Sequence, residues 1–337
     1  MVAGLKPIPK DLPDTVLNQS YWESFAPDLT ISDQKTDTIC KLDDRQAEKS
    51  KARLIKEGYT HLEQPGLDTP LTTVTNTFQK MVDLGIPPVF SFVYDEMWNI
   101  NLQIRGLIKT YLDDADIALM PDFWAWHVSP GQAGWTPHRD KYPFCLFPDA
   151  QKRPKSLTAW IPLTIARPLN GCMYILPADR DKNYGRFNQK GENMPPPVNA
   201  PDIRALPGEA GDVFVWTQHV FHWGSHSADE HDLPPRMSVA FEYQRLDIET
   251  IYNEPAMPVD IMPSFEQRLA LIAKQVQQYT HMYQFGEDLI ALAEKIAANT
   301  SLPDTLEATG EAVPEHDHPA AILEKARHMI KPIKARG

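Results

Sequence analysis

Two residues with one position between them, His138 and Asp140, offer an imidazole nitrogen and a carboxylate oxygen to a metal ion. They lie in the segment Gly134-Trp135-Thr136-Pro137-His138-Arg139-Asp140. Successive side chains of a β-strand point to opposite faces, so a strand here would place both groups on one face. Two imidazoles and one carboxylate form a facial triad that leaves metal positions open for O2 and an organic acid. The pair therefore predicts a metal site, provided that the chain supplies a second histidine.

The second histidine is expected between Gly211 and His226, where a Gly-Asp turn opens an apolar strand that runs into a histidine-rich stretch. Three histidines compete there: His219, His222 and His226. The residues alone leave the choice open.

A carboxylate-binding group is predicted on the strand expected at 236–243. Its alternating pattern places Arg236 and Ser238 on the same face. A guanidinium grips a carboxylate with two parallel hydrogen bonds, and a neighbouring hydroxyl can supply a further donor. This pair suits the distal carboxylate of a small diacid.

These pieces together resemble the phytanoyl-CoA dioxygenase (PhyH-like) family of Fe(II)/2-oxoglutarate-dependent oxygenases, over residues 120 to 245. The resemblance rests on several motifs in the family's order: His138-x-Asp140, Thr158-Ala159-Trp160-Ile161-Pro162-Leu163, Asn170-Gly171-Cys172, Gly211-Asp212, His222 and Arg236-x-Ser238. Aligned on Gly211-Asp212, the family's second iron histidine falls on His222.

The resemblance implies that His138, Asp140 and His222 are the catalytic, metal-binding residues. It also implies Fe(II), 2-oxoglutarate and O2 as cofactor and co-substrates, with the C5 carboxylate of 2-oxoglutarate on Arg236 and Ser238. Thr158 and Trp160 share a face of their strand and are further candidates to contact 2-oxoglutarate. A small organic substrate would be hydroxylated, or otherwise oxidised, with release of succinate and CO2.

Three rival functions are weighed against this one. A halogenase of the same mechanism lacks the carboxylate ligand, and Asp140 fills that position. A cupin-like metal-binding protein or isomerase without 2-oxoglutarate chemistry would share the fold and ligand types, but it has no need of Arg236 with Ser238. A catalytically dead scaffold would not need the full set of ligands. The primary substrate cannot be read from the sequence.

The expected fold is mainly β with helical additions: a double-stranded β-helix (jelly roll, cupin-like) flanked by N- and C-terminal α-helices. Helical spacing of apolar residues predicts helices over 43–58, 72–84, 94–112, two after 260 and a last one near 319–330. Short segments rich in β-branched and aromatic residues predict strands near 123–128, 136–141, 157–163, 172–177, 212–217 and 236–243. The domains are predicted as an N-terminal arm over 1–70, an oxygenase domain over 71–260 and a C-terminal helical extension over 261–337.

The polar loop at 180–205 is long enough to be a lid, and its Arg186 could meet an anionic substrate. The net charge of −12 argues against binding of nucleic acid, which needs clustered Lys and Arg. Three widely spaced cysteines and the lack of a long apolar run predict a cytoplasmic protein that does not enter a membrane. A small molecule is the expected partner, and the oligomeric state stays open.

Overall fold

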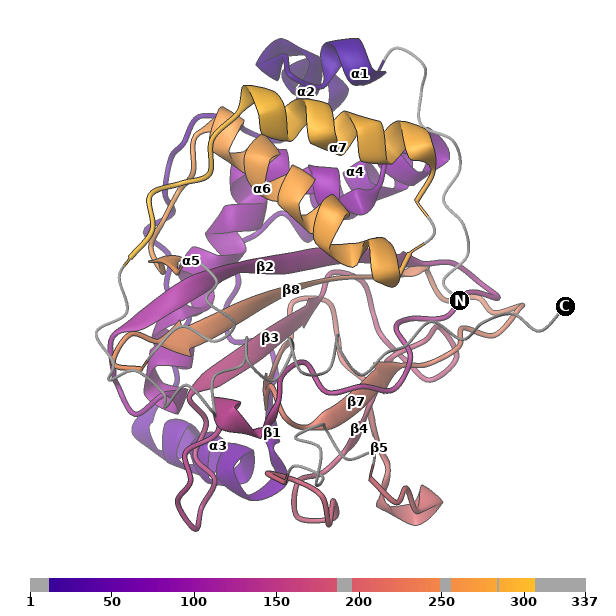
Figure 1. Ribbon diagram of the computed structural model, residues 1–337. Coiled ribbons are helices and arrows are strands. Elements are labelled where there is room, and N and C mark those ends of the chain that lie inside the picture. The colour runs from indigo at the N-terminus through magenta and orange to yellow at the C-terminus, as the bar shows by residue number, and fades with distance from the viewer. Residues whose placement is uncertain (1–11, 187–195, 249–255, 284, 307–337) are drawn as a thin grey trace, which may run out of the picture.

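The chain folds into two antiparallel β-sheets with helices packed on the outer face of the larger one, as the computed structural model shows (Figure 1). The structure describes residues 12–186, 196–248, 256–283 and 285–306. The larger sheet has the strand order β1-β6-β3-β8-β2-β9 and the smaller one has the order β5-β4-β7. The expected fold class, a mainly β core with flanking helices, is confirmed.

The larger sheet is made of strands that are almost completely buried. Its strands are β1 (Tyr59–Leu62), β2 (Ile117–Val128), β3 (Ser156–Pro162), β6 (Val213–Thr217), β8 (Arg236–Arg245) and β9 (Met257–Pro258). Four of them, β2, β3, β6 and β8, match strands predicted from the sequence. β1 and β9 were not predicted, because four residues and two residues are too short to show a period of two.

The smaller sheet consists of β4 (Met173–Leu176), β5 (Arg204–Leu206) and β7 (Phe221–Gly224). A hydrophobic cluster joins the two sheets, with Trp160 and Phe214 from the larger sheet and Met173, Ile175 and Leu206 from the smaller one. The sheets therefore face each other, as the two layers of a jelly roll do. Of these three strands, only β4 was predicted.

The predicted strand at 136–141 is wrong in detail. The segment runs beside β7 but forms only an isolated bridge, in which His138 and His222 exchange both backbone hydrogen bonds at 3.0 Å. A regular antiparallel ladder would pair Gly224 with Thr136 next, but the N–H of Gly224 donates to the carbonyl of Trp135 at 3.0 Å, so the register shifts by one residue beside this bridge. His138 thus lies directly opposite His222, although it does not lie on a regular strand.

Five predicted helices are present, three of them within one residue of their expected bounds and the other two after residue 260, as expected. They are α3 (Asp44–Glu57), α4 (Leu71–Asp83), α5 (Asp95–Tyr111), α6 (Phe265–Gln278) and α7 (Glu287–Asn299). Two short helices, α1 (Leu12–Thr15) and α2 (Gln19–Phe25), precede them. Short 3-10 turns occupy Pro88–Val93 (η1), Pro143–Cys145 (η2), Ala200–Asp202 (η3) and Tyr279–His281 (η5). The predicted helix near 319–330 lies outside the described residues.

The N-terminal arm completes the edge of the larger sheet. Helix α3 ends at Gly58, whose φ of 78° turns the chain directly into β1. β1 then pairs antiparallel with β6, with Tyr59 opposite Trp216. A Cβ at Gly58 would lie 3.0 Å from the Cβ of Ala178, so both the backbone angle and the close packing favour glycine.

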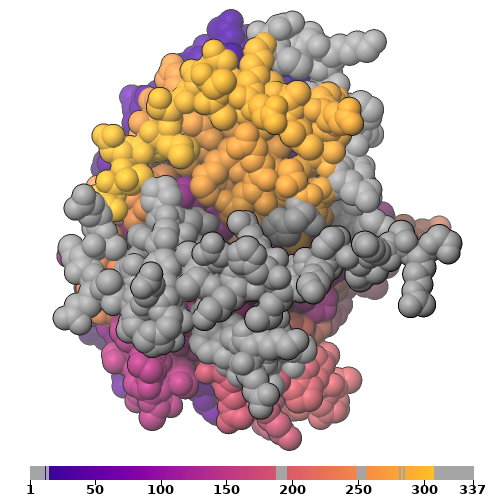
Figure 2. Space-filling model, in the orientation of Figure 1, coloured from indigo at the N-terminus to yellow at the C-terminus, as the bar shows by residue number. Residues whose placement is uncertain are grey.

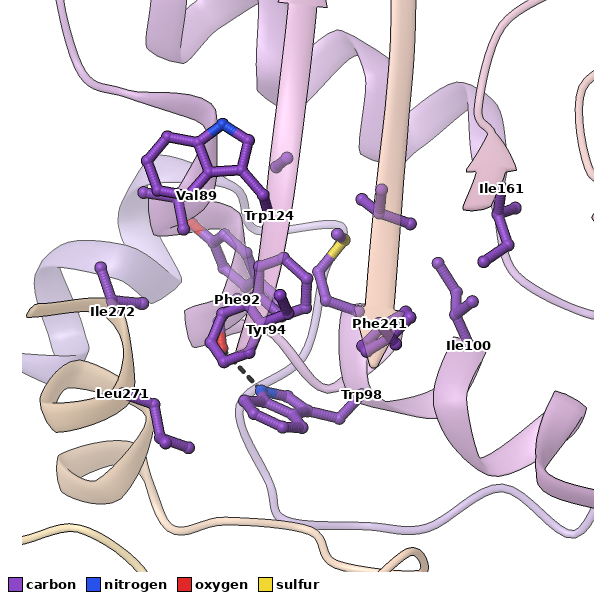
Figure 3. Packing of buried hydrophobic residues seen from close by; sticks show 14 of the residues in the cluster. Val89, Phe92, Tyr94, Trp98, Ile100, Trp124, Ile161, Phe241, Leu271 and Ile272 are labelled. Atoms are coloured by element: carbon purple, nitrogen blue, oxygen red, sulfur yellow. Dashed lines mark hydrogen bonds between the residues drawn. The ribbon is translucent and has the colours of Figure 1, made fainter. Parts of the chain in front are cut away.

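A single core of buried aromatic and aliphatic side chains joins the helices to the larger sheet (Figure 3). Phe92 of η1 packs against Phe123 of β2 and Phe241 of β8, with ring centroids 4.2 Å and 5.6 Å apart. Trp98 of α5 donates its indole N–H to the carbonyl of Phe92 at 2.7 Å. The same cluster contains residues from Leu12 to Ile296, so all three predicted segments of the chain contribute to it.

Helices α6 and α7 cover the molecule above β2 (Figure 2). Their sequences match this position, because the buried side chains of each helix fall at helical spacing. No helix in the described part of the chain is both long enough and apolar enough to cross a membrane.

Candidate active site

Three electron-pair donors meet between the two sheets. The ligand atoms of His138, Asp140 and His222 all lie within 4.8 Å of one another. Nε2 of His138 is 3.3 Å from Oδ1 of Asp140, and Nε2 of His222 is 3.4 Å from the same oxygen. The structure thus brings together the three residues that the sequence singled out.

The backbone sets the tautomer of both imidazoles. Nδ1 of His138 lies 2.7 Å from the carbonyl oxygen of Thr136, and Nδ1 of His222 lies 3.1 Å from that of Val220. A carbonyl oxygen only accepts, so each Nδ1 carries the proton and each Nε2 presents a lone pair. Two lone pairs and a carboxylate oxygen facing one another fit a metal cation.

Two hydrogen-bond donors bind the oxygen of Asp140 that does not face the histidines. The hydroxyl of Thr158 donates to Oδ2 at 2.8 Å, and the indole N–H of Trp216 donates to the same oxygen at 3.1 Å. Oδ1 is therefore the oxygen left to face the histidines. Thr158 also lines the pocket, so its predicted contact with 2-oxoglutarate stays a prediction beside this hydrogen bond to Asp140.

The electrostatics of the three groups favour a cation between them. Burial raises the pKa of Asp140, but the His222 and His138 rings and the Thr158 hydrogen bond outweigh it and hold the pKa below its usual value. Burial lowers the pKa of His222 to about 4, which keeps that ring neutral at pH 7. Burial also lowers the pKa of His138, yet the hydrogen bond and charge of Asp140 leave it raised overall. The carboxylate is ionised, as metal binding requires.

Arg236 is a buried guanidinium in the same pocket. The residue is 1% exposed, its Nε donates to the carbonyl of Gly171 at 3.0 Å and its Nη1 donates to the hydroxyl of Ser238 at 2.7 Å. No carboxylate of the described residues lies within 4.0 Å of it. Burial lowers its pKa to about 10, so the charge persists at pH 7. A buried charge of this kind calls for an anionic partner.

Two glycines make room for this guanidinium. A Cβ at Gly134 would lie 2.9 Å from Nη2 of Arg236 and 2.7 Å from the Cα of Gly224. A Cβ at Gly224 would in turn lie 3.2 Å from Nη2. The close approach of the two backbones therefore shapes the Arg236 end of the pocket.

The remaining candidates from the sequence, Trp160, His219 and His226, differ in how they lie relative to the pocket. Trp160 lines the pocket, its ring centroid is 5.8 Å from the guanidinium carbon of Arg236, and its buried Nε1 bonds to no described group. His219 is buried with Nδ1 on the carbonyl of Lys141 at 3.0 Å, and His226 is exposed. Neither of these two histidines belongs to the group of three ligands.

Sequence reasoning missed a polar cluster at the opposite end of the pocket. Asp122, Glu242 and Tyr279 line this end, and Lys141 pairs with both carboxylates. The strand alternation that paired Arg236 with Ser238 also places Glu242 on that face, so this residue could have been found. Tyr279 lies directly after α6, and nothing in the sequence links it to the site.

The predicted lid contributes no described residue to this pocket. Tyr184 of the 180–205 loop is turned inward, with its hydroxyl 2.7 Å from that of Thr217. Residues 187–195 lie outside the described part, so the lid and the role of Arg186 stay predictions.

A second cavity, of about 300 Å³, adjoins the first at Trp124 and Trp126. The segment between α4 and η1, the end of β2 and Tyr283 line it. The aromatic side chains of β2 therefore line two adjoining pockets.

Residues 89–230 match the family model for "Phytanoyl-CoA dioxygenase (PhyH)". The match covers less than half of the chain, and it confirms the resemblance to that family drawn from the sequence. The protein is an Fe(II)/2-oxoglutarate-dependent oxidoreductase, with iron and 2-oxoglutarate as cofactors. The match contains all three candidate ligands and ends before Arg236, so the argument for Arg236 rests on its own surroundings.

Several solved structures are similar over part of the chain. A non-heme alpha ketoglutarate dependent epimerase, SnoN, from nogalamycin biosynthesis has 17% identity and a TM-score of 0.48, over 65% of this chain and 88% of that one. The carbocyclase SnoK from the same biosynthesis has 17% identity and a TM-score of 0.45, over 67% and 90%. EctD from S. alaskensis with bound Fe has 14% identity and a TM-score of 0.40, over 63% and 80%. No curated protein sequence matches the chain. The family match alone carries the assignment.

Proposed function

We propose that the protein is a dioxygenase in which His138, Asp140 and His222 bind Fe(II), while Arg236 and Ser238 bind the C5 carboxylate of 2-oxoglutarate. When bound, the iron and 2-oxoglutarate would activate O2, with one oxygen atom used to oxidise 2-oxoglutarate to succinate and CO2 and the other available to oxidise the substrate. The product is a hydroxylated, or otherwise oxidised, small organic molecule.

The observation that carries this proposal is the buried, acid-free guanidinium of Arg236 in the pocket that holds the three ligand atoms. A cupin-like metal protein without 2-oxoglutarate would leave that charge without a partner, which is costly. Ser238 accepts from Arg236, so its own proton is free to be donated to a carboxylate. The buried indole N–H of Trp160 offers a third donor.

The remaining residues orient these groups and exclude water. Thr158 and Trp216 hold Asp140 so that Oδ1 faces both imidazoles. Trp124, Trp135 and Tyr279 form aromatic contacts with one another above the site, with centroids 4.8 Å apart for the two pairs that involve Tyr279. We therefore propose that the C-terminal extension closes the pocket of the oxygenase domain.

The test is anaerobic addition of Fe(II) and 2-oxoglutarate, with detection of the weak visible charge-transfer band of their complex. We expect the band in the native protein and its loss in Asp140→Ala and His222→Ala. His219→Asn keeps a donor for the Lys141 carbonyl, and His226→Ala alters an exposed ring, so both controls should retain the band. A band that survives His222→Ala and disappears in His219→Asn would contradict the ligand assignment.

A further inference from the structure

The end of the pocket that contains Glu242 carries more acid than base. Nζ of Lys141 lies 2.9 Å from Oε2 of Glu242 and 3.6 Å from Oδ2 of Asp122, so one ammonium serves two carboxylates. Asp122 is further bound by the hydroxyl of Tyr279 and by the amide of Gln278 at 2.8 Å. In the described part of the chain, Glu242 has no ion-pair partner except Lys141. Glu242 is thus the less satisfied of the two acids.

Glu242 and Arg236 occupy opposite ends of one surface. Both residues line the pocket from the inward face of β8. Their backbones are six positions apart, roughly 20 Å along a strand, but the guanidinium of Arg236 reaches along the strand to Ser238 and so lies closer to Glu242 than its own backbone does. Asp140 is bound to Thr158, the residue paired with Glu242 across β3 and β8. The three ligand atoms therefore lie near the level of Glu242. A diacid that reaches from the metal to Arg236 extends away from Glu242.

Charge balance separates the two ends. The charges of the iron and Arg236 balance those of Asp140 and the two carboxylates of 2-oxoglutarate, so that half of the site is neutral when loaded. Lys141 balances only one of Asp122 and Glu242. When both acids are ionised, one excess negative charge therefore stands beside the space left for the substrate, and a buried excess charge is costly without a partner.

The walls next to this acid are aromatic. Tyr279 packs against Trp124 and Trp135, with both pairs of centroids 4.8 Å apart, and all three rings line the pocket. Aromatic faces attract a cation through their quadrupole, most strongly when the cation is desolvated. A carboxylate among aromatic rings is the combination that recognises an organic ammonium ion.

Burial, and next the nearby charge of Asp122, raise the pKa of Glu242 well above its usual value. Ionised Glu242 is therefore unfavourable in the empty pocket, and an incoming cation would offset that cost. A carboxylate substrate would have the opposite effect, because it would face both Asp122 and Glu242.

We infer that the primary substrate carries a protonated amine, which pairs with Glu242 between Trp135 and Tyr279. The inference rests on the proposed function, since it places the amine beside the iron ligands and away from Arg236. It assigns to Glu242 a substrate-binding role, and to Asp122 and Lys141 the positioning of that carboxylate.

The test uses the protein loaded anaerobically with Fe(II) and 2-oxoglutarate, and three probes of similar shape: benzylammonium, benzyl alcohol and benzoate. Binding is followed by perturbation of the visible band and by thermal shift. We expect benzylammonium to bind at least about tenfold more tightly than either of the other two probes. Glu242→Gln should abolish the preference, Glu242→Asp should keep part of it, and Glu294→Gln on the exposed face of α7 should leave it unchanged.

The outcomes distinguish the two proposals. A visible band that forms normally, with benzyl alcohol or benzoate binding as tightly as benzylammonium, would overturn the amine assignment and leave the proposed function intact. Absence of the band itself would overturn both. If Glu242→Gln does not fold, the ranking of the three probes on the native protein and on Glu242→Asp still decides the question. The affinity for 2-oxoglutarate should change less than about twofold in Glu242→Gln, because Arg236 holds that ligand.

Discussion

The two ends of β8 both bury a charged side chain in one pocket, yet they treat it differently. Arg236 has neutral hydrogen-bond partners and no acidic partner among the residues that the structure describes, whereas Glu242 has Lys141 at 2.9 Å. A charge that the fold leaves unpaired marks the place of a ligand, and a charge that the fold pairs in part indicates the sign of the ligand it can still accept. The charges that surround a buried charged residue therefore indicate which ligand it binds better than its position alone does.

The largest expected effect comes from removing the unpaired charge. Arg236→Met should raise the KM for 2-oxoglutarate by roughly 30-fold to several thousandfold, since truncating one partner of a buried charge pair costs about 2–5 kcal/mol. Steady-state O2 consumption at varied 2-oxoglutarate checks this. Arg180→Met, at an exposed arginine, is the matched control. An unchanged KM for 2-oxoglutarate in Arg236→Met would show that the unpaired charge of Arg236 does not bind this ligand.

The same substitution should have the opposite effect on the stability of the protein without ligands. Burial of an unpaired charge is costly, and even buried ion pairs replaced by apolar side chains of similar volume are often neutral or stabilising, by up to about 4 kcal/mol. Urea denaturation of metal-free Arg236→Met should show a higher free energy of unfolding than the native protein. A marked loss of stability would mean that the bonds to Gly171 and Ser238 outweigh the cost of the buried charge.

Glu242 should make the free energy of unfolding depend on pH. Its pKa is raised in the folded state, so between about pH 4.5 and that raised value the folded protein binds more protons than the unfolded chain. Its contribution to stability is therefore present at low pH and declines as the pH rises, by up to about 1.4 kcal/mol per unit. Glu242→Gln should be increasingly favoured over the native protein in denaturation experiments from about pH 5 to about pH 8. A difference independent of pH would show that Glu242 ionises normally.

The smallest effect is expected at Ser238. Loss of one hydrogen bond in Ser238→Ala should cost about 0.5–1.5 kcal/mol, or roughly a two- to tenfold rise in the KM for 2-oxoglutarate. The kcat should stay unchanged, because the hydroxyl binds a part of the co-substrate that does not react. A fall in kcat with an unchanged KM would instead assign Ser238 to the chemistry.

Much of the site could be predicted because its chemistry is local in sequence. One residue separates His138 from Asp140. In the strand that begins at Arg236, the alternation of side chains determines which of them enter the pocket. The segment at 136–141 could not be predicted correctly, since a one-residue shift in register ends the ladder there, while a single bridge to His222 keeps the two histidines opposite each other. The choice among three histidines needed either the family alignment or the coordinates.

The parts of the site that escaped prediction depend on long-range contacts. Tyr279 reaches Asp122 across more than 150 positions of sequence, and the periodicity of α6 only indicates that this helix packs on something. β1 was also missed, although Gly58 was correctly expected to end the helix before it. Four residues form a strand there because the edge of β6 is available for pairing. This pairing cannot be read from the sequence of the four residues themselves.

That small strand has a practical consequence for anyone preparing shortened versions of the protein. β1 occupies the outer hydrogen-bonding edge of β6, and without it a fully buried strand would present bare N–H and C=O groups to other molecules. Unprotected edges of this kind invite intermolecular pairing. A version that starts at the first residue of α4 should therefore precipitate or self-associate even though every catalytic side chain is retained, whereas one that starts just before α3 keeps the edge sealed.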